Sequence, residues 1–261
     1  MQSSSSFECK TAWEMTWSSV TFGCQALDNL LEGGIPSRGI TEIYGESASG
    51  KSQICMQLAV AAQLPLDRGG TGRGVVYFTT TGGVFPSQRL FQIIETFKER
   101  HRDLQIDYMS NIFIQSQLDL PSFLSCLREK LPAFLQSHKI GLVIVDSLGI
   151  FRTETNAVAR SKNLRVDFGQ QLKKLADLHD FAIVCVNEVV SVPNHETTIP
   201  SLGVSWSNIV TTRLRVARSH KTTRDGNVVR IMSIDHSGTL PRIIGDAAEF
   251  VVTGKGICDI Y

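Results

Sequence analysis

A chain of 261 residues, 42% of them hydrophobic, can bury the core of one large α/β domain and leaves little room for a second full domain. Its net charge of +1 creates no overall field toward nucleic acid or membranes, so any DNA contact must come from local basic patches. No apolar run approaches the length of a membrane span, and residues 1–6 lack the features of a signal peptide. The six cysteines are scattered without a C-x-x-C pair, which favours buried thiols in a reducing compartment over disulfides or zinc.

The predicted elements follow an arm at residues 1–19, and the core domain is predicted to span residues 20–261. The arm mixes aromatic and polar residues, so it either packs on its own domain or docks on a neighbouring subunit. Apolar periodicity then predicts, in chain order, a short helix at 27–31, a strand at 40–44, a helix at 53–63, a strand at 75–78, a helix at 86–100, a strand at 112–115, a helix at 121–137 interrupted near Pro132, and a strand at 142–145.

The second half of the chain continues this alternation and then changes to strands alone. It is predicted to contain a helix at 163–179, a strand at 181–186, a mobile Pro/Ser/Thr-rich loop at 191–205, and strands at 209–216, 228–234 and 249–253, with a hairpin turn at 224–227. Helices that alternate with fully apolar strands predict a doubly wound, mostly parallel α/β sheet, and the last strands predict a C-terminal antiparallel extension. Ligands of such sheets bind at the carboxyl ends of the strands.

One loop between predicted elements carries a phosphate-binding pattern. Residues 45–52 read GESASGKS and fit G-x-x-x-x-G-K-[ST] at each fixed position, between a predicted strand and a predicted helix. Glycines let successive N–H groups face a phosphate, Lys51 can reach the outer phosphates, and the Ser52 hydroxyl can bind Mg²⁺. A Gly/Ser-rich turn that matches by chance is the alternative, and the strand–loop–helix context argues against it. The predicted nucleotide-binding residues of this segment are Gly45, Glu46, Ser47, Ala48, Ser49, Gly50, Lys51, Ser52 and Gln53.

Asp146 is the second predicted ligand of the metal, beside Ser52. It ends an apolar strand, so its carboxylate should emerge at the same sheet edge as the phosphate loop and hold the water shell of Mg²⁺. Taken alone, a strand that ends in Asp is usually only a strand end. The chain between Lys51 and Asp146 has room for two further strands, an order that points to RecA-like and helicase-like ATPases more than to nucleotide kinases or GTPases.

Several segments resemble the eukaryotic RecA-like strand-exchange recombinases, and most of all their paralogues. These segments are LLEGGI at 30–35, ITEIYG at 40–45, KSQIC at 51–55, QLPLDRGG at 63–70, PSLGVSWSN at 200–208, TTRL at 211–214, and the stretch from EF at 249–250 to GIC at 256–258. The resemblance runs from about residue 20 to the end of the chain. It implies a RecA-like P-loop NTPase core that binds ATP and Mg²⁺.

The resemblance also implies roles for residues outside the phosphate loop. Arg89 falls near a position that contacts the adenine side of the nucleotide. Residues 151–162 and 189–203 correspond to the two loops that face DNA in a recombinase filament, although the second also fits an ordinary surface loop. Residues 236–241 match a segment that caps ATP on the neighbouring subunit. Basic residues of the first loop that could meet phosphates are Arg152, Arg160 and Lys162.

Two departures from the family pattern concern hydrolysis. Thr81 stands where the family has its catalytic glutamate, and a threonine cannot take a proton from the attacking water at neutral pH. Since a positioned base contributes about 10²- to 10⁴-fold, we expect weak or no turnover, whereas ATP binding does not need that residue. Glu188 replaces the glutamine that senses the γ-phosphate. We expect its carboxylate to turn away from the phosphates, to bind through Mg²⁺, or to serve as a relocated catalytic base.

Another departure concerns contacts with other macromolecules. The N-terminal helical DNA-binding domain of the recombinases is expected to be missing, and residues 9–12 resemble a subunit-docking motif with Cys9 in place of its aromatic anchor. Arg213 and Arg215 alternate on one strand of the C-terminal hairpin and so share a face. That face is either a strip that contacts DNA phosphates or a solvated edge that resists aggregation.

The sequence therefore predicts an ATP-binding recombinase paralogue in the repair of DNA double-strand breaks by homologous recombination. Its expected partners are another recombinase paralogue or the strand-exchange recombinase, together with single-stranded or branched DNA, and no membrane. The expected location is the nucleus, with the cytoplasm left open. One alternative is an active DNA-dependent ATPase that exchanges strands by itself. Another is a nucleotide-handling P-loop enzyme unrelated to DNA, which fits the loop but not the later segments.

Overall fold

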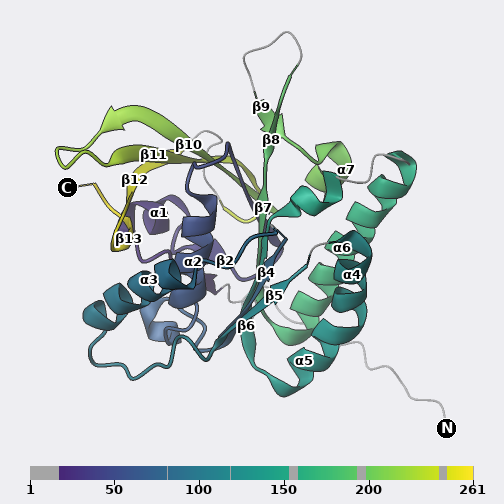
Figure 1. Ribbon diagram of the computed structural model, residues 1–261, viewed down its shortest axis with the longest axis horizontal. Helices are drawn as coiled ribbons and strands as arrows, with labels where there is room; N and C mark the ends of the chain where they lie inside the picture. The colour runs from purple at the N-terminus through teal and green to yellow at the C-terminus, as the bar shows by residue number, and fades with distance from the viewer. Residues whose placement is uncertain are drawn as a thin grey trace.

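The computed structural model of the chain describes residues 18–80, 82–117, 119–152, 158–192, 198–240 and 246–260, with the backbone alone for residues 158–162. A mixed sheet of nine strands runs through this described part of the molecule (Figure 1). The predicted arm lies outside it except for residues 18 and 19, so its role stays a prediction.

The nine strands are parallel in one part of the sheet and antiparallel in the other. Their order across the sheet is β13-β12-β11-β10-β3-β7-β6-β4-β5, and the pairs from β10 to β5 are parallel. The parallel strands are β3 (Ile40–Tyr44), β4 (Gly74–Thr79), β5 (Ile112–Ser116), β6 (Ile140–Asp146), β7 (Ala182–Asn187) and β10 (Thr212–Thr222). The antiparallel extension consists of β11 (Val228–Ser237), β12 (Ala247–Thr253) and β13 (Gly256–Cys258). The predicted α/β fold class is thereby confirmed.

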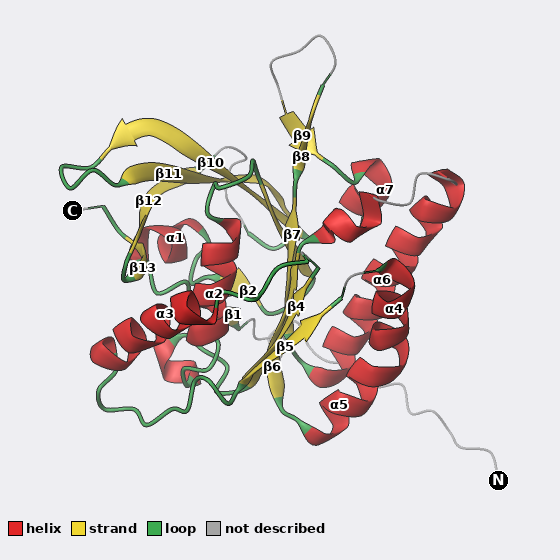
Figure 2. Cartoon of the chain, viewed as in Figure 1, coloured by secondary structure: helices red, strands yellow, loops and turns green. Residues whose placement is uncertain are grey.

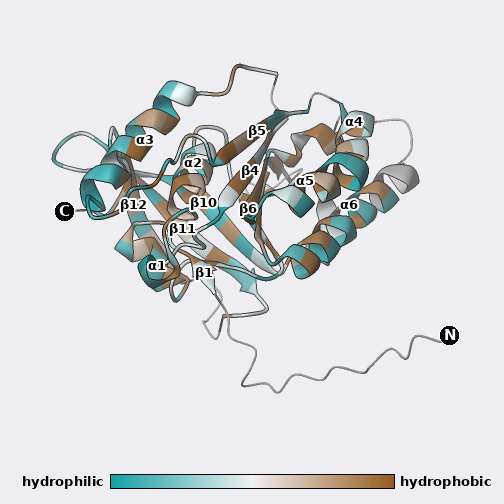
Figure 3. Ribbon diagram, turned by 90° about the horizontal axis from the view of Figure 1, so that it is seen from below, coloured by the Kyte–Doolittle hydropathy of each residue, from teal (hydrophilic) through white to brown (hydrophobic). Residues whose placement is uncertain are grey.

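Helices cover both faces of the sheet, as Figures 1 and 2 show. One face carries α1 (Gln25–Leu30), α2 (Lys51–Ala61) and α3 (Ser87–Arg100). The opposite face carries α4 (Leu120–Ser125), α5 (Leu131–Ser137), α6 (Val158–His179) and α7 (Gly203–Ser207). Two apolar cores result, one on each side of the sheet. The central strands β6 and β7 are buried on both faces, which is why they read as nearly continuous apolar runs in the sequence (Figure 3).

Short elements connect these layers. The remaining strands form two small ladders, β1 (Ser19–Val20) with β2 (Ile35–Pro36), and β8 (Val189–Ser191) with β9 (Thr198–Pro200). The remaining helical turns are η2 (Leu66–Arg68), a π-helical η3 (Cys126–Lys130) and η4 (Leu148–Arg152). The predicted interruption near Pro132 takes the form of η3, which separates α4 from α5.

The structure corrects the sequence-based element predictions at several places, and the helix predicted from residue 163 begins at Val158. Residues 191–205 were expected to form a mobile loop, but part of this stretch belongs to the β8–β9 ladder and to α7. The strand predicted from residue 209 begins at Thr212, because Ile209 and Val210 are buried in the turn that follows α7. The short strand β13 was not predicted at all. Within the described ranges, none of the helices combines the length and the apolar character needed to cross a membrane.

Candidate nucleotide-binding site

The phosphate loop lies where the sequence places it, between β3 and α2. Gly50 is the N-cap of α2 and has a φ of +111°, a left-handed conformation that glycine adopts without strain. A Cβ on Gly45 would stand 2.0 Å from the Val216 carbonyl oxygen of β10, so only glycine lets the loop pass so close to that strand. The loop therefore turns directly into the helix, and the first N–H groups of α2 point into the space in front of it.

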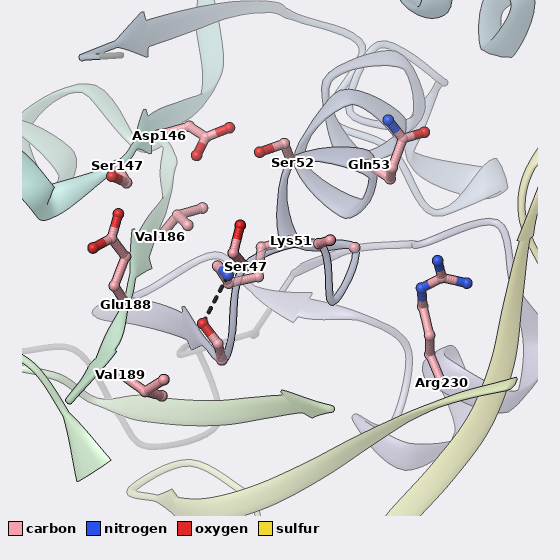
Figure 4. A pocket seen from close by; sticks show the side chains of 13 residues that line it. Ser47, Lys51, Ser52, Gln53, Asp146, Ser147, Val186, Glu188, Val189 and Arg230 are labelled. Atoms are coloured by element: carbon pink, nitrogen blue, oxygen red, sulfur yellow. Dashed lines mark hydrogen bonds between the residues drawn. The ribbon is translucent and has the colours of Figure 1, made fainter. Parts of the chain in front are cut away.

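A cavity of about 560 Å³ opens in front of this loop at the carboxyl ends of β3, β6 and β7 (Figure 4). Its size falls within the range of pockets that hold small ligands. Residues from the loop, from two neighbouring strands and from β11 line it together: Gly45, Ser47, Ala48, Gly50, Lys51, Ser52, Gln53, Asp146, Ser147, Val186, Glu188, Val189 and Arg230. Most of the predicted nucleotide-binding set and both predicted metal ligands thus meet in one place. Glu46 and Ser49 belong to the loop but do not line the cavity.

Lys51 folds back over its own loop. Its Nζ donates a hydrogen bond to the carbonyl oxygen of Gly45 at 2.8 Å (Figure 4). It also donates to the carbonyl oxygen of Glu46 at 2.6 Å. Burial lowers the pKa of Lys51 from its ordinary value, while the carboxylates of Asp146 and Glu188 raise it. A phosphate that enters the cavity would offer Nζ charged oxygens in place of these two carbonyls, and hydrogen bonds between charged partners are the stronger ones.

The carboxylate of Asp146 is held by the neighbouring strand β4. Tyr77 Oη donates a 2.7 Å hydrogen bond to Asp146 Oδ2, and burial, followed by the nearby Asp146 and Cys55, raises the pKa of this phenol so that it stays protonated. Thr80 Oγ1 donates to the Ser147 carbonyl at 2.6 Å and accepts from the Ser147 N–H at 3.0 Å, which fixes the turn after β6. These contacts orient Asp146 toward the cavity that Ser52 also lines.

These residues fit a nucleotide with its magnesium ion. Mg²⁺ is usually bound by one or two protein oxygens together with substrate phosphates and water, which matches the pair Ser52 and Asp146. No group of three or more His, Cys, Asp or Glu side chains forms a self-sufficient metal site among the residues that the structure describes. The loop also contains an unsatisfied polar atom, because the buried Ser49 Oγ has no hydrogen-bond partner in the described structure. Lys51, Ser52 and Asp146 together thus suit ATP with Mg²⁺ better than a metal ion alone.

Glu188 follows β7 and lies between the phosphate loop and Asp146 in the sheet order. Its carboxylate forms an ion pair with Arg152, which ends η4, and both side chains are 46% exposed. This ion pair offsets the negative charge of Glu188, and a role of Glu188 in binding Mg²⁺ or as a relocated base stays a prediction. Arg152, predicted as a DNA contact, is thus engaged at the rim of the cavity in this structure.

A buried polar network links the strand before the phosphate loop to the segment after β7. Glu42 on β3 is fully buried, and its carboxylate accepts hydrogen bonds from Asn187 at 2.7 Å and from Trp206 Nε1 at 2.9 Å. Arg213 on β10 pairs with the same carboxylate and also donates to Ser207 Oγ at 2.9 Å. The side chain of Arg213 is only 12% exposed. In this structure the guanidinium of Arg213 neutralises a buried carboxylate, and its contact with DNA stays a prediction.

Two arginines lie near the helix side of the loop, and they differ in their partners. Arg89 on α3 does not line the cavity; it donates to Gln53 Oε1 at 2.6 Å, to the Thr253 carbonyl at 2.6 Å and to the Gly254 carbonyl at 2.9 Å. It braces the β12–β13 turn against Gln53, which does line the cavity. Contact between Arg89 and adenine stays a prediction. Arg230, which was not predicted here, does line the cavity.

The other predicted residues are distributed as follows. Arg215 is exposed on β10, and its DNA contact stays a prediction. Thr81 and the side chains of Arg160 and Lys162 lie outside the described residues, as does residue 241 of the predicted cap segment. Sequence reasoning missed Tyr77, Glu42 and Arg230. A signal existed for Glu42, since a charged residue inside a strand predicted to be buried must have a partner.

Comparisons with known proteins bear on the whole chain. A family model described as Rad51 matches residues 15–260. The "DNA repair protein XRCC3" of Bos taurus is 34% identical over 259 residues, which is 91% of this chain and 74% of that protein. The "DNA repair protein rhp57" of Schizosaccharomyces pombe is 30% identical over 277 residues, covering 89% of this chain and 78% of that protein. The "DNA repair protein XRCC3 homolog" of Arabidopsis thaliana is 28% identical over 284 residues, covering 92% and 93% of the two chains.

Proposed function

The chain belongs to the Rad51 family, as an XRCC3-like paralogue in homologous-recombination DNA repair, and from this premise we propose that it binds ATP and Mg²⁺ as a subunit of a paralogue complex. The family resemblance inferred from sequence segments is confirmed by these matches. The proposed complex contains another recombinase paralogue or the strand-exchange recombinase. It supports recombinase filaments and junction processing on single-stranded or branched DNA in the nucleus.

One observation supports the nucleotide-binding part of the proposal more than any other. The cavity in front of the phosphate loop collects Lys51, Ser52 and Asp146 at the carboxyl ends of adjacent strands. Lys51 would hold the outer phosphates, while Ser52 and Asp146 would hold the metal and its water shell. Bound Mg²⁺ would offset the negative charge of the phosphates. These residues bind and orient the nucleotide, and none of them is a base for the attacking water.

Slow hydrolysis is part of the proposed function. Thr81 has no carboxylate to accept a proton, and the carboxylate of Glu188 is held by Arg152. Without a positioned base, hydrolysis should be about 10²- to 10⁴-fold slower than in a recombinase that has one. ATP would then act by ordering the subunit for assembly, and turnover would be secondary.

A DNA-stimulated ATPase that exchanges strands by itself is the second candidate. The observation in its favour is the complete set of Lys51, Ser52 and Asp146 around the cavity. Thr81 and the engaged Glu188 count against it, because this candidate requires rapid turnover. The two candidates differ in whether the isolated chain hydrolyses ATP and in whether it needs a partner.

The proposal is tested by capturing partners with the tagged chain and its Lys51→Ala variant in the presence of Mg²⁺ and ATP. The wild-type chain should retain another Rad51-family protein, identified by mass spectrometry, and Lys51→Ala should retain at least about tenfold less of it, because a coupling of about 1.4 kcal/mol between sites corresponds to that factor. Lys98→Ala is the matched control, since Lys98 is half-exposed on α3 and pairs with Glu95, away from the cavity.

Loss of the partner with Lys51→Ala but not with Lys98→Ala would support the proposal. Equal retention by all three proteins would reject a role of the nucleotide in assembly. Since the two hydrogen bonds that Lys51 donates within the described residues go to carbonyls of its own loop, the variant should fold, and its thermal unfolding without nucleotide should match that of the wild type.

A further inference from the structure

Arg230 reaches the nucleotide-binding cavity from a distant part of the chain. It lies on β11, which β10 separates from the strand of the phosphate loop in the sheet order. Its side chain nevertheless crosses to the loop, because a Cβ built on Gly50 would stand 3.2 Å from Arg230 Cδ and 3.3 Å from its Nε. In Figure 4 Arg230 lies on the other side of the loop from Asp146 and Glu188.

The guanidinium of Arg230 is poorly satisfied by the protein. Its Nε is buried and has no hydrogen-bond partner among the described residues. One of its terminal nitrogens donates a 3.0 Å hydrogen bond to the Val228 carbonyl of the same strand. Arg89 differs, because its guanidinium donates hydrogen bonds to the side chain of Gln53 and to two carbonyl oxygens of the β12–β13 turn.

The positive charge of Arg230 is also unneutralised. No carboxylate in the described part of the chain forms an ion pair with it, and the residue directly opposite on β10 is another arginine, Arg218. Like charges directly opposite on paired strands are destabilising. Burial, and then the charge of Arg218, lower the pKa of Arg230 from its ordinary value, because both disfavour the charged form of its guanidinium. An anion in the cavity would remove this cost.

The two ends of the cavity identify that anion. Lys51, Asp146 and Glu188 lie in the part of the cavity that would hold the outer phosphates and the metal. Gln53 lies on the side away from Asp146 and Glu188 (Figure 4), and this side is the one left for the nucleoside. Arg230 lies on this second side. We propose that Arg230 is a nucleotide-binding residue, whose guanidinium donates to the phosphate nearest the ribose of a nucleotide held by the same chain. This inference rests on the proposed function and deepens it.

The test compares the affinity of ADP and of ATP for the wild type and for Arg230→Gln by isothermal titration with Mg²⁺. Because ADP and ATP share the phosphate nearest the ribose, the affinity for both should fall by a similar factor of about 10 to 100, the range for hydrogen bonds to charged groups. Arg224→Gln is the control, as it removes the same charge from the exposed hairpin turn. Its affinities should stay within about twofold of the wild type.

Thermal unfolding without nucleotide separates binding from structure. If the unpaired charge is retained for a ligand, Arg230→Gln should unfold at the same temperature as the wild type or higher. Unchanged affinity for ADP and ATP in Arg230→Gln would overturn the inference alone. Weaker binding together with a melting temperature lowered by more than about 4 °C would also overturn it, because it would reveal a structural role. Failure of the wild type and of Arg224→Gln to bind either nucleotide would instead overturn the proposed function.

Discussion

Glu188 and Arg152 form the contact that most affects how the site can work. Glu188 lines the cavity after β7, where a second carboxylate near a phosphate would be repelled by a few kcal/mol at an effective dielectric constant of about 20. The ion pair with Arg152 offsets that repulsion. It also engages Oε2, one of the two carboxylate oxygens of Glu188, which favours a carboxylate that turns toward the rim over a relocated base.

We therefore predict that Glu188→Gln hydrolyses ATP at the wild-type rate, within about twofold, when both are measured as partnered proteins. Removal of a true base would slow hydrolysis about 10²- to 10⁴-fold. Glu95→Gln is the control, because Glu95 is a half-exposed carboxylate on α3 that pairs with Lys98. If hydrolysis is abolished in Glu188→Gln but not in Glu95→Gln, Glu188 is the base, and the ion pair with Arg152 does not prevent that role.

Individual site residues were predictable from the sequence where the chemistry is local. The phosphate loop needs consecutive residues with fixed spacing, so Lys51 and Ser52 could be found without a structure. Arg230 could not be found, because it approaches Gly50 only through the order of the strands. The bond from Tyr77 to Asp146 was hidden for the same reason, since it depends on β4 lying beside β6.

At the scale of elements, the carboxylate of Glu42 joins β3, β7, β10 and α7. A buried charge is stable only when it is paired and hydrogen-bonded, and here Asn187, Trp206 and Arg213 supply the donors. Asn187 Oδ1 in turn accepts from Ser201 Oγ at 2.6 Å, which ties the end of the β8–β9 ladder to the same network. The strand before the phosphate loop is thus connected to the segment that follows β7.

Arg213→Ala should lower the free energy of unfolding by about 3–5 kcal/mol, because it leaves the carboxylate of Glu42 buried without its countercharge. Urea denaturation followed by circular dichroism measures this difference. Arg215→Ala is the matched control, since Arg215 lies two residues further along the same strand and is exposed. It should change stability by no more than about 0.5 kcal/mol.

A similar small effect of both substitutions would show that Glu42 does not depend on Arg213. The same pair of variants also separates fold from DNA binding. Weaker DNA binding in Arg215→Ala at unchanged stability would support the remaining part of the predicted basic strip.

Elements were predicted well where burial produces a clear period and poorly where polar residues are held by distant partners. Strands such as β6 and β7 are buried on both faces, so their apolar runs were unambiguous. Residues 191–205 are rich in Pro, Ser and Thr and look like a loop. The end of this stretch is held by the hydrogen bond of Ser201 to Asn187 and by Trp206, which packs in the core, contacts that no local pattern reveals.

For the whole molecule, alternation of helices and strands was enough to predict a doubly wound sheet with an antiparallel extension. The order of the strands was not predictable from that alternation, and it is this order that creates the cavity. Because β3 lies between β10 and β7, the loop after β3 meets Asp146 and Glu188 on one side and Arg230 on the other.

The same arrangement gives the proposed mode of action. In this proposal Lys51, Ser52 and Asp146 would hold a nucleotide and its metal, and Thr81 could not serve as the base for hydrolysis. A Rad51-family protein of this kind is suited to keep ATP bound within an assembly. If ATP binds the assembled complex but not the separate subunits, it stabilises the complex by an amount that grows with the logarithm of the ATP concentration divided by Kd. The property to measure is therefore whether the complex keeps its ATP.

The most direct measurement follows ATP bound and ATP hydrolysed by the same purified complex of this chain with its partner, with single-stranded DNA present and an active recombinase assayed alongside. The account predicts one ATP retained by this chain and a hydrolysis rate at its site about 10²- to 10⁴-fold below that of the recombinase. Loss of ATP from this chain in the intact complex, or hydrolysis by the isolated chain at the recombinase's own rate, would contradict it.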